Sequence, residues 1–509
     1  MCRYFIQFFA ILCTSVCSVK AQSINEKINQ YWQKNETSII NEYLDFVAIP
    51  NVSSDTANIS RNTAFIIQMM EQRGIKAIRL NGTTAGVTPA VYGEVMVPGA
   101  KKTIAFYAHY DGQPINPLQW AKGLEPFTPV FLTAPVERGG SLIPFQKGQQ
   151  VNPEWRLSGR GSADDKAGVM AILNAYDALK KSNTALTNNL KFFFEGEEEV
   201  GSLHLDEIFV NNKQRLESDI WIIADGPRHV SGKKLIQFGV RGDVNLNLTV
   251  YGPKRPLHSG NYGNWAPNPA MMLVQLLSGM KDEKGNVLVK DFYADVTPLT
   301  IKEKEAIAKV PDIEETLKKE LGINQPDGDG KPFLELLHLP TLNINGIQSA
   351  NVGKLAANII PSKAEATLDL RLVIGNDVVR QITKVKDHIQ SKGYYIIDHE
   401  PTDEERNMHS RIVKITVEKG YNAQRTPMDL PIAQTVIKAV QTTVSYPLIL
   451  LPSAGGSLPL FLFEKQLGAK VITVPVVNYD NNQHAENENV QIKFLIEGIA
   501  TYAAIMVMQ

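Results

Sequence analysis

Short apolar segments alternate with amphipathic stretches through the first half of the chain. The segments 103–108, 190–194 and 219–224 carry few charges, which is typical of strands buried on both faces of a sheet. Between them, positions 166–181 have apolar residues at spacings of three and four, so we predict a helix there. This alternation predicts an α/β fold with a mostly parallel central sheet.

A second pattern begins after Phe238. Apolar and polar residues alternate from Val244 to Val250, which predicts an antiparallel strand with one face in water. The elements expected after it are helix 268–280, strands 341–344 and 364–373, helix 377–392 and strand 411–417. This β-α-β-β-α-β order is the split ferredoxin-like arrangement. We therefore expect a second domain inserted into the first, which helix 430–444 and strand 471–476 then complete.

The start of the chain has the pattern of a secretory signal peptide. Arg3 precedes an apolar run, and positions 19–21 form a small-residue cleavage site. The run is shorter than the roughly 20 residues that cross a bilayer, so we predict a cleaved leader, residues 1–21, and no membrane attachment afterwards. This predicts an exported protein of the periplasm or the extracellular space. All three cysteines lie in the leader, so a metal would have to be held by His, Asp and Glu.

The charges of the chain nearly cancel. Lys and Arg number 52 and Asp and Glu number 53, in a chain of 509 residues. This balance gives no electrostatic reason to expect nucleic acid or an anionic membrane as partner. A small polar ligand fits the composition better.

Histidines and carboxylates follow the predicted strands at their carboxyl ends, where open α/β sheets bind ligands. His109 ends the first strand, and Asp111 would point to the same side and could orient the imidazole. Asp164 and Asp165 open the predicted helix 166–181, where aspartate is as typical of a helix cap as of a metal ligand.

Further acidic residues follow the next two strands. Four glutamates, Glu195 and 197–199, occupy five positions after strand 190–194, and a divalent cation explains them at least as well as a solvated turn. Two neighbouring carboxylates permit one to bind metal while the other moves protons. Asp225 ends strand 219–224, and His484 follows the last strand. So many candidate ligands in one domain favour a metal site over separate structural roles.

The motifs HYDGQP, GRGSADDKAG, EGEEEVGS, IIADG, LHSG and NQHAENE occur in this order. Together they resemble the carnosinase-like, or non-specific dipeptidase, branch of the dinuclear zinc peptidases related to aminoacylase and carboxypeptidase G. The resemblance implies a catalytic domain made of residues 22–238 and 420–509, with an inserted lid and dimerisation domain at 239–419. It also implies a metallo-exopeptidase, a dipeptidase or carboxypeptidase, that hydrolyses a peptide bond next to a free carboxylate.

The resemblance further implies two divalent ions per chain, normally zinc, with manganese or cobalt as alternatives. It gives one metal the ligands His109, Asp164 and Asp225, and the other metal Glu199 and His484. Asp164 would bridge the two metals. Asp111 would orient His109, and Glu198 would be the general base that acts on a metal-bridged water.

Residues of the inserted domain complete the implied site. His258, donated by the partner subunit of a homodimer, would stabilise the oxyanion. Asn358, Arg371, Gly456 and Ser457 match positions that touch the substrate, and Arg371 is suited to grip a carboxylate. Each has a plainer alternative: Arg371 could form an ion pair on the strand surface, and Gly456 could belong to an ordinary turn.

Two departures leave the substrate open. The segment between His109 and Asp164 is longer than this family usually has, and we predict a surface loop at 133–154 near the mouth of the site. Asn358 stands where dipeptidases of this branch often have Thr. The substrate is therefore a small peptide or an N-acyl amino acid, the latter if the chain is an aminoacylase or deacylase. A catalytically silent peptide-binding protein would be expected to lack a ligand or Glu198, and none is missing.

Overall fold

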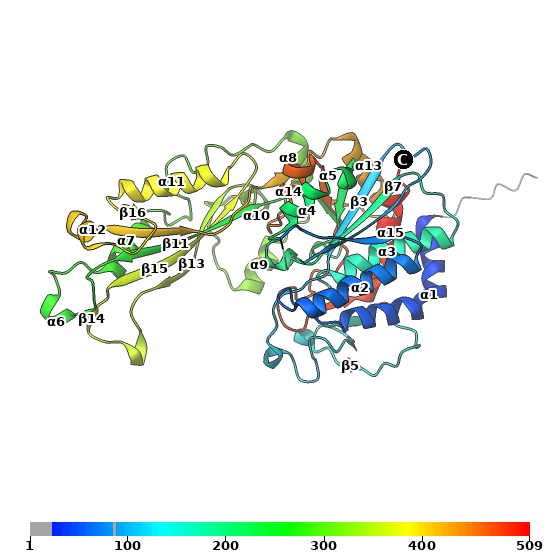
Figure 1. Ribbon diagram of the computed structural model, residues 1–509, viewed down its shortest axis with the longest axis horizontal. Helices are drawn as coiled ribbons and strands as arrows, with labels where there is room; N and C mark the ends of the chain where they lie inside the picture. Colours follow the sequence, from blue (N-terminus) through cyan, green and yellow to red (C-terminus); the bar gives the residue numbers. More distant parts are fainter. Residues whose placement is uncertain (1–22, 85–87) are drawn as a thin grey trace, which may run out of the picture.

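A computed structural model describes residues 23–84 and 88–509. The predicted leader, residues 1–21, therefore lies outside the described residues. The molecule is elongated, with a large body of helices and strands at one end of its long axis and a smaller sheet reaching out at the other (Figure 1). No helix among the described residues is long and apolar enough to cross a membrane.

The large body is built on an eight-stranded sheet. Its strands, in spatial order, are β1 (Ala77–Leu80), β2 (Ala90–Val95), β7 (Asn189–Glu195), β3 (Thr103–His109), β8 (Ile220–Ile223), β20 (Val471–Thr473), β9 (Leu235–Gln237) and β19 (Ile449–Leu451). The four strands from β7 to β20 are parallel, but β1 and β2 are antiparallel to their neighbours and β9 is antiparallel to β20. The prediction of a mostly parallel sheet thus holds at the centre only. The whole sheet is mixed, because the antiparallel pairs β1–β2, β2–β7 and β9–β20 flank the parallel centre.

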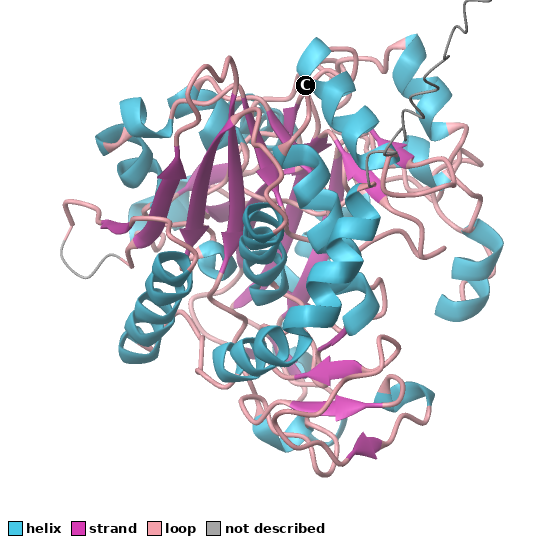
Figure 2. Cartoon of the chain, turned by 90° about the vertical axis from the view of Figure 1, so that its right-hand side faces the viewer, coloured by secondary structure: helices cyan, strands magenta, loops and turns pink. Residues whose placement is uncertain are grey.

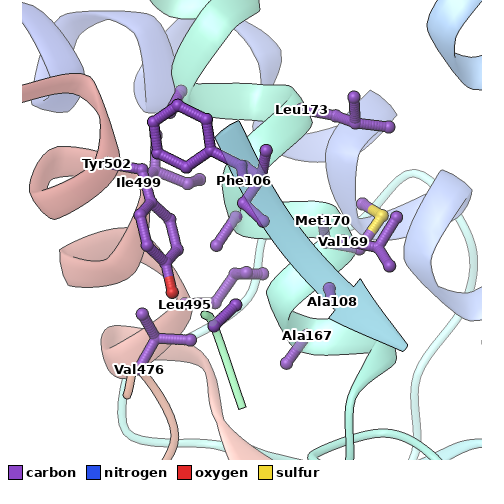
Figure 3. Packing of buried hydrophobic residues seen from close by; sticks show 14 of the residues in the cluster. Phe106, Ala108, Ala167, Val169, Met170, Leu173, Val476, Leu495, Ile499 and Tyr502 are labelled. Carbon is purple, nitrogen blue, oxygen red and sulfur yellow. The ribbon is translucent and has the colours of Figure 1, made fainter. Parts of the chain in front are cut away.

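Helices cover both faces of this sheet (Figure 2). One face carries α1 (Ile24–Val47), α3 (Lys166–Lys181) and α15 (Ile492–Met506), and the other carries α4 (Leu205–Asn211) and α14 (Phe461–Leu467). The periodicity at 166–181 correctly predicts α3, whose N-cap Asp165 accepts a hydrogen bond from the amide of Gly168 (3.1 Å). Apolar side chains of β3, α3 and α15 interlock in the core (Figure 3), and this packing fixes the end of β3 against the start of α3.

A five-stranded sheet forms the smaller body. Its strands, in spatial order, are β13 (Thr341–Gln348), β15 (Lys363–Leu372), β11 (Gly242–Tyr251), β17 (Ile412–Val417) and β16 (Tyr395–Ile397). One face packs against α7 (Pro269–Ser278) and α11 (Val378–Ser391) around a separate apolar core. Along the chain these elements run β11, α7, β13, β15, α11, β16 and β17, so each predicted helix and strand is present.

The two connections to this smaller sheet lie side by side, because β10 (Gly239–Val240) pairs with β18 (Gln424–Arg425). The remaining helices are α2 (Thr56–Gln72), α5 (Lys213–Leu216), α6 (Ser259–Tyr262), α8 (Ile301–Ile307), α9 (Glu314–Leu321), α10 (Phe333–Leu336), α12 (Asp403–Met408) and α13 (Pro431–Gln441), and a two-stranded ribbon pairs β12 (Leu257–His258) with β14 (Ile359–Ile360).

The extra segment 133–154 is more ordered than the predicted surface loop. It contains the 3-10 turn η2 (Val136–Arg138) and β5 (Leu142–Ile143). Strand β5 lies at the edge of a four-stranded sheet. The strands of this sheet, in spatial order, are β21 (Asn489–Gln491), β6 (Arg156–Ser158), β4 (Val130–Leu132) and β5. The segment therefore belongs to a sheet that also contains a strand following His484 in the chain.

Candidate metal centre

Three parallel strands bring candidate ligands to one edge of the central sheet. His109 ends β3 and lies opposite Glu195, the last residue of β7, so the turn after β7 that carries Glu198 begins beside the imidazole. Asp225 follows the end of the adjacent strand β8. The carboxyl ends of parallel strands meet at the same edge, which is why residues far apart in the chain converge here.

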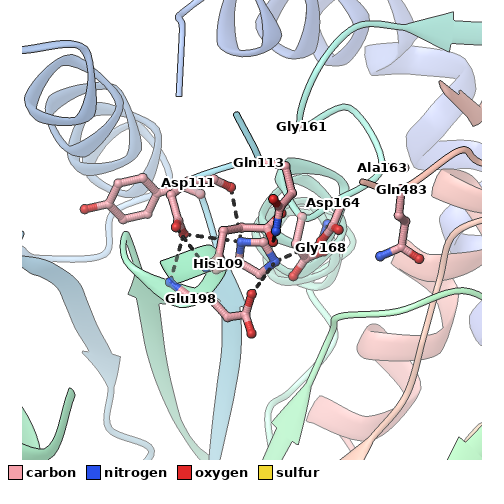
Figure 4. A network of polar contacts seen from close by, with 12 residues as sticks. His109, Asp111, Gln113, Gly161, Ala163, Asp164, Gly168, Glu198 and Gln483 are labelled. Atoms are coloured by element: carbon pink, nitrogen blue, oxygen red, sulfur yellow. Dashed lines mark hydrogen bonds and ion pairs between the residues drawn. The ribbon is translucent and has the colours of Figure 1, made fainter. Parts of the chain in front are cut away.

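Asp164 lies between two histidines. Its Oδ1 is 2.9 Å from His109 Nε2 (Figure 4), and its Oδ2 is 3.2 Å from His484 Nε2. His484 Nε2 is also 3.2 Å from Glu199 Oε2. Each oxygen of one carboxylate thus faces a different imidazole, which is the arrangement that a carboxylate shared by two cations would require.

Two groups of side chains offer ligand atoms that lie within 4.8 Å of one another: His109 with Asp164 and Glu199, and His109 with Glu198 and Asp225. These groups use only carboxylate oxygen and imidazole nitrogen. Zinc accepts such donors, as do manganese and cobalt, so the residues present fit a divalent metal. Four of the five ligands predicted from the sequence belong to these groups, and the fifth, His484, contacts Asp164 and Glu199.

Asp111 supports this cluster more widely than predicted. Its carboxylate accepts hydrogen bonds from the backbone amides of Glu198 (3.1 Å) and Glu199 (3.0 Å). Its backbone oxygen lies 3.2 Å from His109 Nδ1, and its Oδ1 lies 3.4 Å from the same nitrogen. The fully buried Asp111 side chain therefore holds the turn that carries both glutamates, besides facing the histidine.

Glu488 is a supporting residue that the sequence patterns did not single out. Its carboxylate is fully buried and accepts hydrogen bonds from the amides of Gly161 (2.9 Å), Ala163 (2.8 Å) and Asp164 (3.0 Å) and from Arg160 Nη1 (2.8 Å). It thus fixes the turn that presents Asp164. The motif NQHAENE ends at this residue, four positions after His484, so the sequence contained the signal without indicating that the carboxylate is buried.

Burial and neighbouring charges shift the pKa values of the side chains in this cluster strongly. Burial raises the pKa of Glu198 well above its usual range, and burial together with Asp164 raises the pKa of Asp225 to about 7. Hydrogen bonds to Asp164 and Glu199 raise the pKa of His484 to about 10. Protons are therefore drawn to a cluster with more carboxylates than imidazoles, as expected of a site that divalent cations would neutralise.

The predicted substrate residues fall into two places. Arg371 Nη1 donates a hydrogen bond to Ser457 Oγ (2.8 Å), and the amide of Arg241 donates one to the backbone oxygen of Gly456 (3.2 Å). The loop that contains Gly456 and Ser457 therefore meets Arg371 at the base of the smaller sheet. Arg371 Nε also lies 3.1 Å from Asp369 Oδ1, so the surface ion pair considered as an alternative is present too.

His258 and Asn358 lie elsewhere. His258 is exposed on β12, and the amide of the next residue donates to the oxygen of Asn358 (3.0 Å). Their neighbours α6 and β14 lie at the far end of the smaller sheet, away from β3, the strand that His109 ends (Figure 1). One chain therefore assembles the five candidate ligands, but it does not bring His258 or Asn358 to them.

Comparison with known proteins decides the family. The model of peptidase family M20/M25/M40 matches residues 105–508. The chain belongs to this family. This M20 peptidase is therefore a metal-dependent peptide hydrolase, and the resemblance seen in its motifs is confirmed.

Relatives of this M20 peptidase align over almost its whole length. A Cys-Gly metallodipeptidase of Candida albicans is 29% identical over 89% of this chain and 91% of its own. The Beta-Ala-His dipeptidase of Homo sapiens is 25% identical over 94% of this chain and 91% of its own. Among solved structures, an M20 family metallo-carboxypeptidase of Sulfolobus solfataricus has a TM-score of 0.76 and 28% identity, covering 92% of this chain and 98% of its own.

The prediction that the protein is exported to a periplasm or the extracellular space is wrong. The relatives that align over nearly the whole M20 peptidase are Cys-Gly metallodipeptidases and a Beta-Ala-His dipeptidase, and this relationship contradicts export. The leader pattern on which the prediction depended lies outside the described residues.

Proposed function

We propose that this M20 peptidase is a dinuclear metallo-dipeptidase that hydrolyses the amide bond next to a free carboxylate. The observation that carries the proposal is the position of Asp164, whose two oxygens face His109 and His484 at 2.9 and 3.2 Å. The dipeptidase names of its relatives, which align over 89% and 94% of the chain, support this substrate class.

The proposed metal ligands are those that converge on Asp164. One ion would be held by His109, Asp164 and Asp225, and the other by Asp164, Glu199 and His484. Zinc suits this oxygen and nitrogen set, and manganese or cobalt are the alternatives. When bound, the cations would supply Lewis-acid chemistry that polarises the scissile carbonyl and lowers the pKa of a water.

Glu198 is the proposed general base. Its Oε2 lies 3.9 Å from His109 Nε2, beyond hydrogen-bond distance, so its carboxylate is beside the ligands and still free to act on substrate. Burial favours its protonated form by raising its pKa, which suits a group that takes a proton from water and then delivers it to the leaving amine. By accepting hydrogen bonds from the amides of Glu198 and Glu199, Asp111 would hold the proposed base, Glu198, and the proposed ligand, Glu199, in fixed positions relative to each other.

Arg371 and the loop Gly456–Ser457 are the proposed grip for the substrate's free carboxylate. Arg371 already donates to Ser457 Oγ, so the guanidinium and the hydroxyl converge on one point. The ion pair with Asp369 would be exchanged for the substrate's carboxylate, a planar partner that an arginine can bind through two parallel hydrogen bonds.

The inserted segment 239–419 is proposed as a ferredoxin-like lid and dimerisation domain between catalytic parts 22–238 and 420–509. Its exposed His258 and Asn358 would serve the site of a partner subunit in a homodimer, with His258 donating to the oxyanion. The support is that α6 and β14, beside these residues, lie at the end of the molecule away from β3, which carries the candidate ligand His109 (Figure 1). A two-fold pairing would give each site the other chain's histidine.

The test is an activity screen with the zinc-loaded full chain. Dipeptides with a free carboxylate are compared with the same amino acids carrying an N-acetyl or fatty acyl group, with release of free amine as readout. We expect dipeptides to be cleaved and the variant Glu198→Gln to be inactive in the same screen. Preferred cleavage of the N-acyl substrates would replace the proposal by an N-acyl amino acid hydrolase, and cleavage of neither would reject both.

A further inference from the structure

The extra segment 133–154 contacts the loop that carries His484. The contact is made by Glu137, in the 3-10 turn η2. Glu137 Oε1 accepts hydrogen bonds from Asn482 Nδ2 (2.9 Å) and Asn487 Nδ2 (3.0 Å). One carboxylate oxygen therefore joins two asparagines that flank His484 in the chain.

This loop has an unusual backbone. Asn482, His484 and Asn487 have φ values of 59°, 59° and 60°, in the left-handed region that residues other than glycine seldom adopt. Three such residues so close together persist only when contacts outside the loop hold them. Asparagine tolerates this conformation. The direction of the His484 imidazole then depends on how firmly Asn482 and Asn487, on either side of it in the loop, are held.

The same turn also holds the start of the loop. Arg138 Nη2 donates to the hydroxyl of Tyr479 (2.9 Å), and Arg138 Nη1 lies 3.4 Å from Asp480 Oδ2. Asp480 is paired in turn with Arg156 at 3.0 Å. Two neighbouring residues of η2 thus contact the loop on both sides of His484, through partners that are not themselves candidate ligands.

We propose that Glu137 is a positioning residue for His484. By accepting from both asparagines, its carboxylate holds the loop in the conformation that places His484 Nε2 3.2 Å from Asp164 and Glu199. The inference rests on the proposed function, in which His484 is a metal ligand. It also explains what the extra segment does, because a stretch of chain inserted between two ligands would stabilise a third ligand from outside.

The first experiment titrates zinc into the metal-free full chain in competition with a chromophoric chelator. For Glu137→Ala, one of the two zinc affinities should fall by about 10- to 100-fold, the usual cost of losing a group that orients a ligand, and the other should change by less than about threefold. Glu137→Gln keeps an acceptor oxygen and should recover part of the loss.

A matched control lies on the same segment. Glu154 is exposed like Glu137 and accepts hydrogen bonds from Gln491 (2.7 Å) and Lys493 (2.9 Å), outside the His484 loop. Glu154→Ala should leave both zinc affinities unchanged. If Glu137→Ala and Glu154→Ala give the same two affinities as wild type, Glu137 does not position His484.

A double-mutant cycle separates contact from conformation. Replacing Asn482 and Asn487 by glycine keeps the left-handed backbone accessible and removes both amide donors. This variant should lose at least as much zinc affinity as Glu137→Ala, because it also removes the Asn487 oxygen that accepts a hydrogen bond from the amide of Ala121 (2.9 Å). Adding Glu137→Ala to it should cost nothing more. Additive losses would show that Glu137 acts by some other route and would overturn the proposal.

Amide hydrogen exchange of the metal-free chain distinguishes this inference from the proposed function. The amides of Ala485 and Asn489 donate to Asn482 and Asn481 within the loop, and Glu137→Ala should speed their exchange at least about fivefold over Glu154→Ala. If wild type binds fewer than two zinc ions, the proposed function fails while faster exchange still supports a positioning role. Equal exchange in the two variants refutes that role whatever the metal content.

Discussion

Replacing Asp111 with asparagine removes one charge from the cluster and leaves the candidate ligands in place. The carboxylate accepts from two backbone amides, those of Glu198 at 3.1 Å and Glu199 at 3.0 Å. An asparagine has a single side-chain oxygen, so whichever way it turns, its NH2 group faces one of these N–H donors. One charge-assisted hydrogen bond is therefore lost inside a fully buried site.

The magnitude follows from this count. Losing one hydrogen bond to a charged group costs about 1.5–3 kcal/mol. Since about 1.4 kcal/mol corresponds to a tenfold change, Asp111→Asn should lower kcat/KM by roughly 10- to 150-fold. Zinc affinity at the site that includes Glu199 should fall in the same range, because the amide of Glu199 loses its anchor.

The assay measures kcat/KM for a dipeptide at saturating zinc, together with zinc affinity by chelator competition. Asp377→Asn is the matched control. The carboxylate of Asp377 also accepts a hydrogen bond from a backbone amide, that of Arg380 (3.1 Å), but it lies at the start of helix α11 in the smaller body. Its kcat/KM should stay within about threefold of wild type. If Asp111→Asn likewise stays within that range and both zinc affinities are unchanged, the positioning of the two glutamates by Asp111 is refuted.

Three further predictions follow from the same geometry. Glu198→Gln should keep two zinc ions by elemental analysis and lose at least about 10²-fold in kcat, whereas Glu199→Gln should lose zinc; the reverse behaviour would shift the assignment by one position. Chelating the metals should lower the thermal midpoint of the chain, because the buried carboxylates then repel one another, and an unchanged midpoint in calorimetry would argue against a metal among them. Mixing inactive His258→Ala with inactive Glu198→Gln under subunit exchange should restore activity in the mixed dimer; proven exchange without activity would mean that His258 does not serve a partner's site.

Local patterns predicted the parts of the fold that local forces specify. The apolar periodicity of Lys166–Lys181 gives α3 with the same bounds, since an amphipathic helix is read directly from spacing. The alternation from Val244 to Val250 likewise predicts β11, although Asn245 and Asn247 are half-buried and Thr249 is buried, so this face is not fully exposed. By contrast, β4, β5 and β6 have only two or three residues each, too few to show a period, so the small sheet that orders the extra segment was not foreseen.

The candidate site divides in the same way. Ligands at strand ends could be predicted because the ends of parallel strands meet regardless of the side chains between them. Contacts between distant loops could not: Arg160 and Glu488 are 328 positions apart, and nothing local indicates that a buried glutamate fixes the turn before Asp164. The hydrogen bonds of Glu137 with Asn482 and Asn487 span 345 and 350 positions and are equally invisible in the sequence.

The dinuclear proposal depends on one carboxylate, that of Asp164, joining two metal sites in a single chain. The most direct measurement is the zinc content per chain of the dialysed, zinc-loaded protein, determined by elemental mass spectrometry for wild type and for Asp164→Ala. We expect two zinc ions per chain in wild type and a loss at both sites in the variant. One ion or none in wild type, or one fully retained ion in Asp164→Ala, would contradict the proposal.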